Sequence, residues 1–280
     1  MLRIAVPNKG GLASPTDQLL KEAGYRGRRH DRELVSVDEE NGIEFFYLRA
    51  RDIAVYVGQG TVDAGITGRD LMLDSGVNAV EHRTLGFGRS TFRFAAPAGK
   101  ATSLKDLEGK RVATSYARVV RTYLEEHGID AQVIRLDGAI ESTVYLGVAD
   151  VVADVVETGS TLRAAGLEVF GEPILESEAV LIRPVGPVTE PLKVLDRRIK
   201  SVKVARRYVM MDYDVPSDLV DAAVAITPGL ESPTVSPLHS DGWVAVRAMV
   251  DSDTTHRVMD QLYDLGARAI IITSIHSCRL

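Results

Sequence analysis

Short apolar runs alternate with amphipathic segments along the first two thirds of the chain. Residues 2–7 form a strand-like apolar run, a polar loop with two glycines follows, and residues 14–23 have the spacing of an amphipathic helix. The pattern then predicts a strand at residues 43–49, a short helix at 52–57 with Asp52 as its cap, and a strand at 64–68 that runs into a turn. This alternation favours a parallel α/β sheet.

A weak internal repeat indicates that the sheet occurs twice. Residues 110–116 resemble the start of the chain, and residues 147–152 resemble residues 60–65. In both places a helix would end at a glycine and an aspartate would precede a buried strand. Two similar lobes with a cleft between them are the natural interpretation, and a cleft of this kind is the default ligand site. Chance similarity of short apolar strings is the alternative.

The rhythm changes from residue 208 onward. The predicted elements are a strand at 208–211, a helix at 217–224, strands at 234–238 and 243–250, a helix at 254–265 and a strand at 267–274. The order βαββαβ is typical of a ferredoxin-like module, a small sandwich that often pairs by its sheet and binds small regulators.

These observations together predict an α/β protein with three domains. The first lobe comprises residues 1–90 with the returning segment 184–207, the second lobe residues 91–183, and the C-terminal module residues 208–280.

Composition narrows the class of protein. The 280 residues include 33 Lys and Arg against 39 Asp and Glu, a net charge of −6, and no basic tract, which disfavours a nucleic-acid-binding surface. The longest apolar runs have the length of strands, and the apolar run at residues 1–7 is too short for the core of a signal peptide followed by a cleavage site. We therefore expect a cytoplasmic protein without a membrane segment. Cys278 has no partner for an intrachain disulfide, and the scattered histidines with no CxxC or HExxH motif disfavour a zinc site.

The stretch from Asp150 to Leu162 is the most informative. An apolar strand containing Asp154 runs into a Thr-Gly-Ser-Thr turn, and a helix follows. Backbone N–H groups at such a helix start, with three hydroxyls and a glycine, can hold a phosphate, and flanking carboxylates suit sugar hydroxyls or magnesium. A plain helix N-cap is the alternative, but an ionised carboxylate inside an apolar run is costly without partners and favours a functional role.

This stretch resembles the phosphoribosyl-pyrophosphate (PRPP) loop of the ATP phosphoribosyltransferase family, the first enzyme of histidine biosynthesis. Further family-like segments occur in order along nearly the whole chain, at residues 3–10, 63–71, 111–116 and 227–234. The C-terminal module makes the chain resemble the long, self-regulated form; short-form members lack that domain and rely on a synthetase-like partner. The resemblance implies a two-lobed core like that of periplasmic binding proteins, followed by an ACT-like regulatory domain.

The family reaction implied is attack of N1 of ATP on C1′ of PRPP, with pyrophosphate leaving together with Mg²⁺. Positioning and charge stabilisation can do most of this work, and no dedicated triad is visible. By resemblance, the PRPP site consists of Asp154, Glu157, Thr158, Gly159, Ser160, Thr161 and Leu162, and the catalytic residues are Lys9, Arg49, Glu141 and Asp154. Mg²⁺ is expected to be held mainly by substrate phosphates, with its protein ligands unknown.

The ATP site implied by the resemblance consists of Lys9, Arg51, Asp70, Leu71 and Tyr116. Adenine would lie between the lobes with the Tyr116 ring as a packing surface. Solvated surface roles for Arg49 and Arg51, and a simple helix N-terminal role for Glu141, are the alternatives. The chain departs from the usual family pattern at Gly11, where an arginine is frequent, and at Ala117-Arg118, where Pro-Asn is common.

Histidine is the inhibitor that the resemblance implies. Its pocket would be lined by Asp214, Leu230, Ser232, Thr234 and Ala269, between modules of neighbouring subunits. The family also implies homo-oligomers, dimers that assemble into hexamers. A turn-capping role of Asp214 before Pro216 is the alternative.

Two other classes of protein compete with the enzyme. The two-lobed architecture also resembles periplasmic solute-binding proteins, which bind without chemistry, but that interpretation leaves the phosphate loop and its acids unexplained. A purely regulatory protein that uses the C-terminal module is the third possibility.

Overall fold

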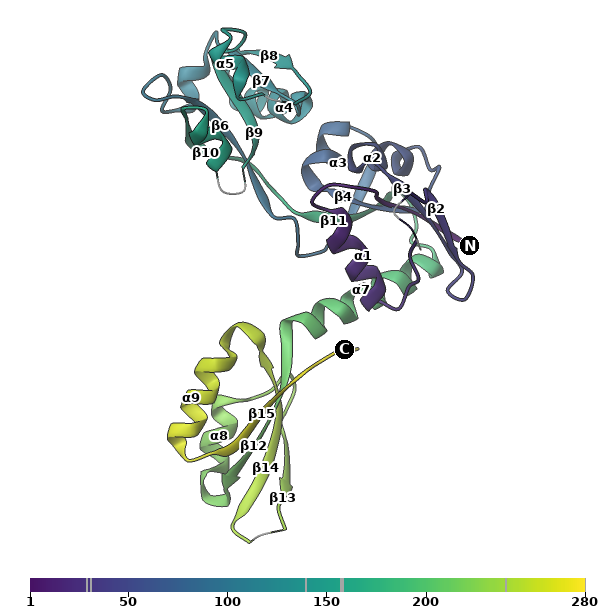
Figure 1. The fold of residues 1–280 in the computed structure, drawn as a ribbon, viewed down its shortest axis with the longest axis vertical. Helices are drawn as coiled ribbons and strands as arrows, with labels where there is room; N and C mark the ends of the chain where they lie inside the picture. Colours follow the sequence, from purple (N-terminus) through teal and green to yellow (C-terminus); the bar gives the residue numbers. More distant parts are fainter. Residues whose placement is uncertain (29, 31, 139, 157–158, 240, 280) are drawn as a thin grey trace. The chain divides into compact units, whose positions relative to one another are not determined.

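The computed structural model describes residues 1–28, 30, 32–138, 140–156, 159–239 and 241–279. Its contacts divide the chain into two compact units (Figure 1). The first unit comprises Met1–Lys21 and Tyr25–Lys193, and the second Glu22–Gly24 and Val194–Leu280.

The first sheet of the first unit has the strand order β2-β3-β1-β4-β11-β5. Its strands are β1 (Leu2–Pro7), β2 (Val35–Asp38), β3 (Ile43–Leu48), β4 (Ala64–Gly68), β5 (Ala79–Thr84) and β11 (Ala179–Pro184), and its helices are α1 (Ala13–Glu22), α2 (Ala50–Gly58) and α3 (Arg69–Ser75). The apolar side of α2, with Ile53, Ala54 and Val57 fully buried, packs on this sheet. The prediction that Asp52 caps this helix is wrong, because α2 begins two residues earlier and Asp52 lies in its first turn.

The second sheet has the order β10-β6-β9-β7-β8. Its strands are β6 (Ser90–Pro97), β7 (Arg111–Thr114), β8 (Gln132–Arg135), β9 (Val151–Val156) and β10 (Leu167–Ser177), and its helices are η1 (Leu104–Leu107), α4 (Ala117–Glu126), α5 (Ser142–Tyr145) and α6 (Ser160–Ala164). Val120 and Leu124 of α4 join one core cluster, whereas Leu162 of α6 joins the other, so helices cover both faces of the sheet.

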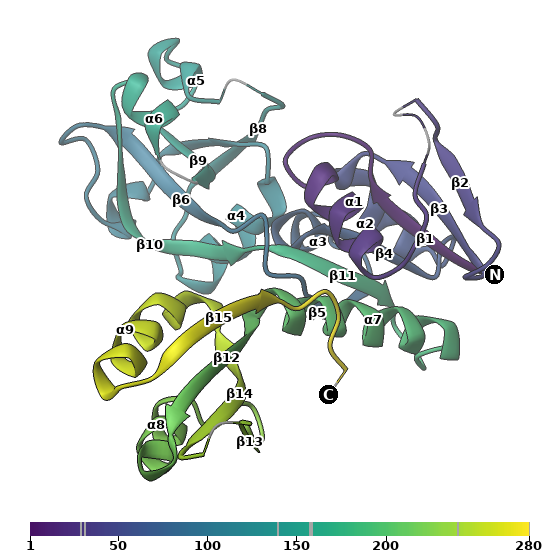
Figure 2. The same cartoon turned by 60° about the horizontal axis from the view of Figure 1, so that its bottom comes forward.

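The two sheets repeat one topology. In each, a central strand (β1 or β7) runs parallel to two neighbours (β3 and β4, or β8 and β9). An antiparallel strand (β11 or β6) follows beside β4 or β9 and pairs antiparallel with an edge strand (β5 or β10), and the first sheet has β2 as an additional antiparallel edge strand. The predicted repeat and the two-lobed α/β core are thereby confirmed. Figure 2 shows β10 continuing into β11, which crosses to the first sheet; the second sheet therefore ends at Ser177, whereas the sequence had placed residues up to 183 in the second lobe.

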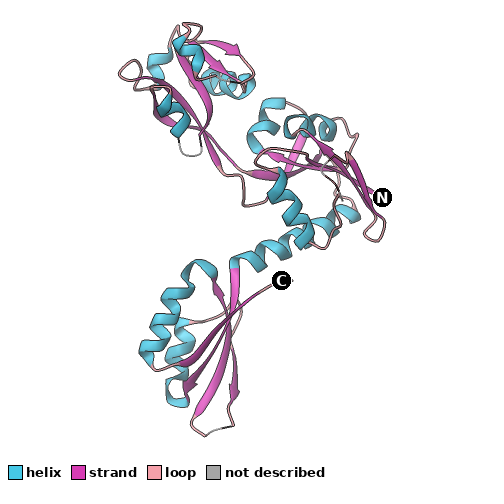
Figure 3. Ribbon diagram, in the orientation of Figure 1, coloured by secondary structure: helices cyan, strands magenta, loops and turns pink. Residues whose placement is uncertain are grey.

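The C-terminal module has the predicted βαββαβ order, with an antiparallel sheet ordered β13-β14-β12-β15. Its elements are β12 (Tyr208–Pro216), η2 (Ser217–Leu219), α8 (Val220–Ile226), β13 (Thr234–Pro237), β14 (Trp243–Asp251), η3 (Ser252–Thr254), α9 (Thr255–Leu265) and β15 (Arg268–Ser274). Figure 3 shows α8 and α9 on one side of these strands, and their side chains share one core with the sheet.

Helix α7 (Glu190–Arg207) precedes this module and is its connection to the preceding chain. Among the helices that the structure describes, none combines the length and apolarity needed to cross a membrane.

Candidate active site

Candidate residues of the first lobe gather where parallel strands end. Pro7 of β1 pairs with Leu48 of β3, and the N–H of Asn8 donates to the Leu48 carbonyl at 2.8 Å. Lys9 and Arg49 are both exposed; Lys9 is the second residue after β1 and Arg49 the first after β3. Asp70 and Leu71 follow β4, on the other side of β1, in the first turn of α3. Since the carboxyl ends of parallel strands meet at one sheet edge, this edge is the expected position of a ligand site.

Candidate residues of the second lobe occupy the equivalent edge. Tyr116 comes two residues after β7, and Asp154 lies near the end of β9, which runs parallel to β7. The repeated topology thus places both groups at the carboxyl edges of their sheets.

Tyr116 is the point at which the two edges meet. The guanidinium of Arg51 lies 4.9 Å from the Tyr116 ring centroid, and the Phe92 ring packs edge-on at 5.1 Å. Burial raises the pKa of the Tyr116 hydroxyl, the Asp70 carboxylate raises it further by its charge and a hydrogen bond, and Arg51 lowers it. The predicted ATP residues Arg51, Asp70 and Tyr116 therefore lie together.

Arg51 also connects the lobes through Asp74. Its Nη1 donates to Asp74 Oδ2 at 3.1 Å and to the Ser115 carbonyl at 3.1 Å. The N–H of Arg118 donates to Asp74 Oδ1 at 3.0 Å, and the Asp74 side chain is only 6% exposed. Arg118, one of the departures from the family pattern, lies with its guanidinium against Gly76, where any Cβ would collide with it.

Asp154 lies in surroundings that oppose its charge. Burial raises the pKa of its carboxyl group, and the nearby carboxylates of Glu141 and Asp70 raise it further, against the hydrogen bond from the Val155 N–H at 2.8 Å. Glu141 immediately precedes α5. Within the described part of the chain, no group of three or more His, Cys, Asp or Glu side chains has the arrangement of a metal site.

The loop after β9 turns at Gly159, whose backbone has the left-handed conformation that favours glycine. Gly159 has φ +70° and stands immediately before α6. Ser160 and Thr161 are exposed in the first turn, whereas the Leu162 side chain is buried in the core. The predicted site residues Glu157 and Thr158 lie outside the described residues.

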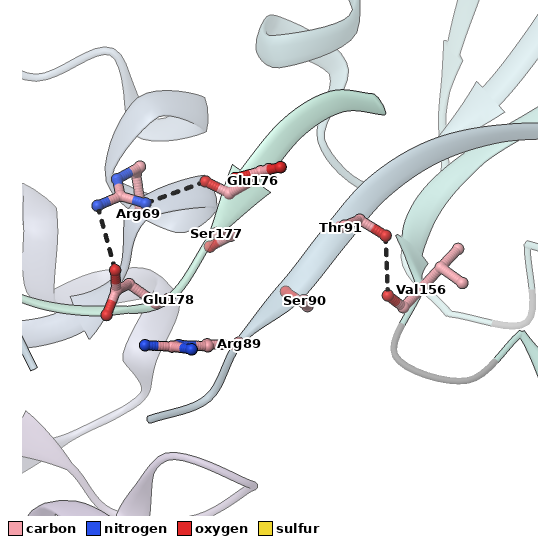
Figure 4. Close-up of a pocket in the computed structure, with 8 residues that line it drawn as sticks. All are labelled: Arg69, Arg89, Ser90, Thr91, Val156, Glu176, Ser177 and Glu178. Atoms are coloured by element: carbon pink, nitrogen blue, oxygen red, sulfur yellow. Dashed lines mark hydrogen bonds and ion pairs between the residues drawn. The ribbon is translucent and has the colours of Figure 1, made fainter. Parts of the chain in front are cut away.

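A cavity of about 410 Å³ lies beside the strands that connect the lobes (Figure 4). It is lined by Arg69, Arg89, Ser90, Thr91, Val156, Glu176, Ser177 and Glu178. Arg69 forms a bidentate pair with Glu81 at 2.8 Å and donates to the Glu176 carbonyl at 3.0 Å, while Thr91 Oγ1 donates to the Val156 carbonyl at 3.2 Å. The cavity therefore reaches Val156, the last residue of β9, which lies between Asp154 and Glu157 of the predicted PRPP site.

Sequence reasoning missed Asp74, Ser177 and the residues of this cavity. Ser177 hydrogen-bonds Asp70 across 107 positions, so no local spacing could reveal the contact. The one available signal was the polar run Glu176-Ser177-Glu178 between apolar strand segments.

Comparison with known proteins agrees with this geometry. A sequence profile described as "ATP phosphoribosyltransferase" matches residues 49–201, and one described as "HisG, C-terminal domain" matches residues 205–277. ATP phosphoribosyltransferases of Arthrobacter sp. (strain FB24) and Streptomyces coelicolor are 62% and 59% identical to the chain over 100% of both partners. The chain belongs to the ATP phosphoribosyltransferase family. It is thus a pentosyltransferase that joins N1 of ATP to C1′ of PRPP, giving N1-(5-phosphoribosyl)-ATP and pyrophosphate in the first step of histidine biosynthesis.

Solved structures extend the comparison to the fold. The ATP phosphoribosyl transferase (HisG:HisZ) complex from Thermotoga maritima matches with a TM-score of 0.61 and 26% identity, covering 71% of this chain and 99% of that one. The GluR0 ligand-binding core from Nostoc punctiforme matches with a TM-score of 0.50 at 19% identity, over 72% of this chain and 93% of that one. The second match shows a shared two-lobed fold and leaves the identification as an enzyme unchanged.

The C-terminal module places the predicted histidine residues in two groups, one on strands β12 and β15 and the other at edge strand β13 and the loop before it. Asp214, within β12, pairs with Ala245 of β14 and Arg268 of β15, so the alternative that it caps a turn is wrong. Ala269 of β15 has φ 49°, beside a register shift between β12 and β15. The other three residues lie on the opposite side, with Thr234 starting β13 and Leu230 and Ser232 in the loop before it.

Proposed function

We propose that PRPP binds at the turn after β9, with Asp154 on its ribose hydroxyls and residues 159–162 around its 5′-phosphate. One observation supports this most strongly. The carboxylate of Asp154, whose pKa is raised by burial, lies at the carboxyl edge of the sheet, shortly before the left-handed turn at Gly159. Ribose hydroxyls are donors that a carboxylate accepts well, and backbone N–H groups of the turn suit a phosphate. Glu157 and Thr158 belong to this proposal through the family resemblance alone.

ATP occupies the opposite side of this site in our proposal. Adenine packs beside Tyr116, with Asp70 and Leu71 at its edge, and Arg51 moves from the tyrosine face towards the triphosphate. Lys9 and Arg49 supply positive charge where the pyrophosphate develops. Because N1 of adenine is already nucleophilic, this arrangement works by positioning the two substrates and stabilising charge.

Mg²⁺ fits this site through oxygen ligands. Asp154 and Glu141 are the protein groups of the right type, since Mg²⁺ prefers oxygen ligands and substrate phosphates. The Glu141 carboxylate is near enough to raise the pKa of the Asp154 carboxyl group by its charge. When bound, the ion would neutralise the pyrophosphate that leaves. The protein's own part is to hold ribose and phosphate so that C1′ faces the adenine.

Initial-rate measurements with ATP, PRPP and Mg²⁺ test these assignments. Asp154→Asn should raise the Michaelis constant for PRPP, and Tyr116→Ala should raise the Michaelis constant for ATP. The proposed placement would be contradicted if Asp154→Asn affected only ATP and Tyr116→Ala only PRPP.

We also propose that histidine acts as a feedback inhibitor at the C-terminal module. The enzyme is, in this proposal, a cytoplasmic homo-oligomer. The division of the predicted pocket residues between the β15 and β13 sides of one sheet supports a pocket shared by two copies, one giving Asp214 and Ala269 and the other Leu230, Ser232 and Thr234. Histidine inhibition that persists in a dilute monomer would contradict it.

A further inference from the structure

Ser177 is a buried hydroxyl at the point where the chain crosses from one lobe to the other. It is 5% exposed, it ends β10, and it pairs with Ser90 of β6 in the second sheet. Two residues later, Ala179 pairs with Gly68 of β4 in the first sheet. Figure 4 shows Ser177 on this crossing strand, between Glu176 and Glu178.

The Ser177 hydroxyl is committed to Asp70. It accepts a hydrogen bond from the Asp70 N–H at 3.1 Å and donates one to Asp70 Oδ1 at 2.9 Å. Asp70 is itself 7% exposed, and its Oδ1 lies so close to Gly68 that any Cβ there would collide with it. The Ser177 hydroxyl on the crossing strand therefore holds the carboxylate in this orientation, and the absence of a side chain at residue 68 leaves room for it.

The orientation of the Asp70 carboxylate determines its interaction with the Tyr116 hydroxyl. The Asp70 carboxylate is, after burial, the strongest influence on the Tyr116 hydroxyl, which belongs to the second lobe. The same carboxylate hydrogen-bonds the Tyr116 hydroxyl, so the Ser177 contact that fixes the carboxylate also fixes the partner of the tyrosine. The side-chain interactions from Ser177 to Asp70 and from Asp70 to Tyr116 thus connect the crossing strand to the proposed adenine pocket.

We propose that Ser177 is a positioning residue for ATP: it fixes the Asp70 carboxylate so that Asp70 and Tyr116 together present a formed adenine pocket. This inference rests on the proposed placement of ATP beside Tyr116. Ser177 itself touches no substrate in this account, and its effect reaches ATP only through Asp70.

Steady-state kinetics of two Ser177 variants provide the first test. Ser177→Ala should raise the Michaelis constant for ATP about tenfold, since one hydrogen bond to a charged group is lost, and leave that for PRPP within about twofold. Ser177→Thr keeps the hydroxyl and should restore ATP use. Equal changes for both substrates, or no recovery in Ser177→Thr, would indicate a purely structural role and overturn the proposal.

A spectroscopic readout follows the same contact without substrates. With ¹³C at the tyrosine Cζ positions, the Tyr116 resonance is assigned by its loss in Tyr116→Phe. We expect it to shift in Ser177→Ala at neutral pH, because the carboxylate beside the tyrosine hydroxyl moves when its serine partner is lost. An unchanged resonance would refute the positioning role.

Asp70→Asn and Tyr116→Ala separate this inference from the function on which it rests. If these two variants raise the Michaelis constant for ATP and Ser177→Ala does not, the Ser177 proposal fails alone. If none of the three affects ATP, the proposed adenine pocket fails, and the Ser177 proposal fails with it.

Discussion

At the scale of single residues, Asp154 illustrates how a functional group opposes stability. Burial and the carboxylates of Glu141 and Asp70 raise its pKa, so the folded state binds its proton more tightly than the unfolded state does. Above the folded-state pKa the ionised carboxylate destabilises the ligand-free protein by its full amount, and the penalty disappears below the pKa of the unfolded chain. In the site that we propose, this charge serves PRPP and its metal ion.

Asp154→Asn should therefore have opposite effects on stability and activity. We expect the ligand-free variant to unfold at a higher temperature than the wild type at pH 8, with the difference vanishing as the pH falls below the ordinary range of aspartate. The Michaelis constant for PRPP should rise about tenfold to a hundredfold, since a hydrogen bond to a charged group is lost. Thermal unfolding across pH and initial rates check both statements, and a variant with unaltered PRPP kinetics would remove Asp154 from the site.

Asp74 is a second residue whose contribution to stability comes from its hydrogen-bond partners. Its carboxylate accepts from Arg51 and from the Arg118 N–H, and its side chain is only 6% exposed. Asp74→Asn should cost about 1–3 kcal/mol of unfolding free energy in urea titrations. The matched control is Glu190→Gln, whose pair with Lys193 has side chains 57% and 72% exposed and should matter by about 0.5 kcal/mol or less. Equal losses in the two variants would contradict the assigned role of Asp74 between the lobes.

At the scale of elements, the turn between β9 and α6 depends on Gly159. A residue with a Cβ at φ +70° is strained, and the nearest groups to that Cβ would be Arg163 Nη1 at 3.0 Å and Val156 Cγ1 at 3.6 Å. Gly159→Ala should cost about 1 kcal/mol of stability and raise the Michaelis constant for PRPP, and the bulkier Gly159→Val should abolish activity.

Gly166 supplies the control for this turn. It follows the same short helix with φ +73° and has open space around its Cβ position. Gly166→Ala should therefore lose similar stability in denaturation experiments while PRPP kinetics stay normal. If both alanine variants impair PRPP use alike, the turn at Gly159 has no special relation to the phosphate.

The elements also show what sequence reasoning could reach. Strands such as β4 were predicted to the residue because an apolar run ends in a turn. Strand β12 was predicted five residues too short, because Asp212 and Asp214 alternate with buried Met211, Tyr213 and Val215 and resembled a strand end. The start of α2 was missed because Arg49 makes no side-chain cap. Of the site, Asp70, Tyr116 and Asp154 could be predicted by resemblance, whereas Ser177 and Asp74 act through contacts between distant segments.

At the scale of the whole molecule, the proposed histidine site and the proposed substrate site belong to separate parts of the chain. Asp214→Ala should abolish histidine inhibition and retain turnover, because an inhibitor site of this kind acts only through coupling, typically about 1–3 kcal/mol. Inhibition curves at fixed ATP and PRPP measure this. Asp221→Ala, at an exposed position of α8 in the same module, is the control and should keep normal inhibition. Parallel loss of turnover and inhibition in Asp214→Ala would indicate a folding role.

The central claim is that the carboxyl edges of the two repeated sheets form one site in which PRPP meets ATP. Pyrophosphate release from PRPP, measured in the presence of Mg²⁺ with and without ATP, tests it most directly when wild type and Asp154→Asn are compared. The account predicts ATP-dependent release by the wild type and a much larger PRPP requirement for the variant. ATP-dependent release with the same PRPP dependence in both proteins would contradict it.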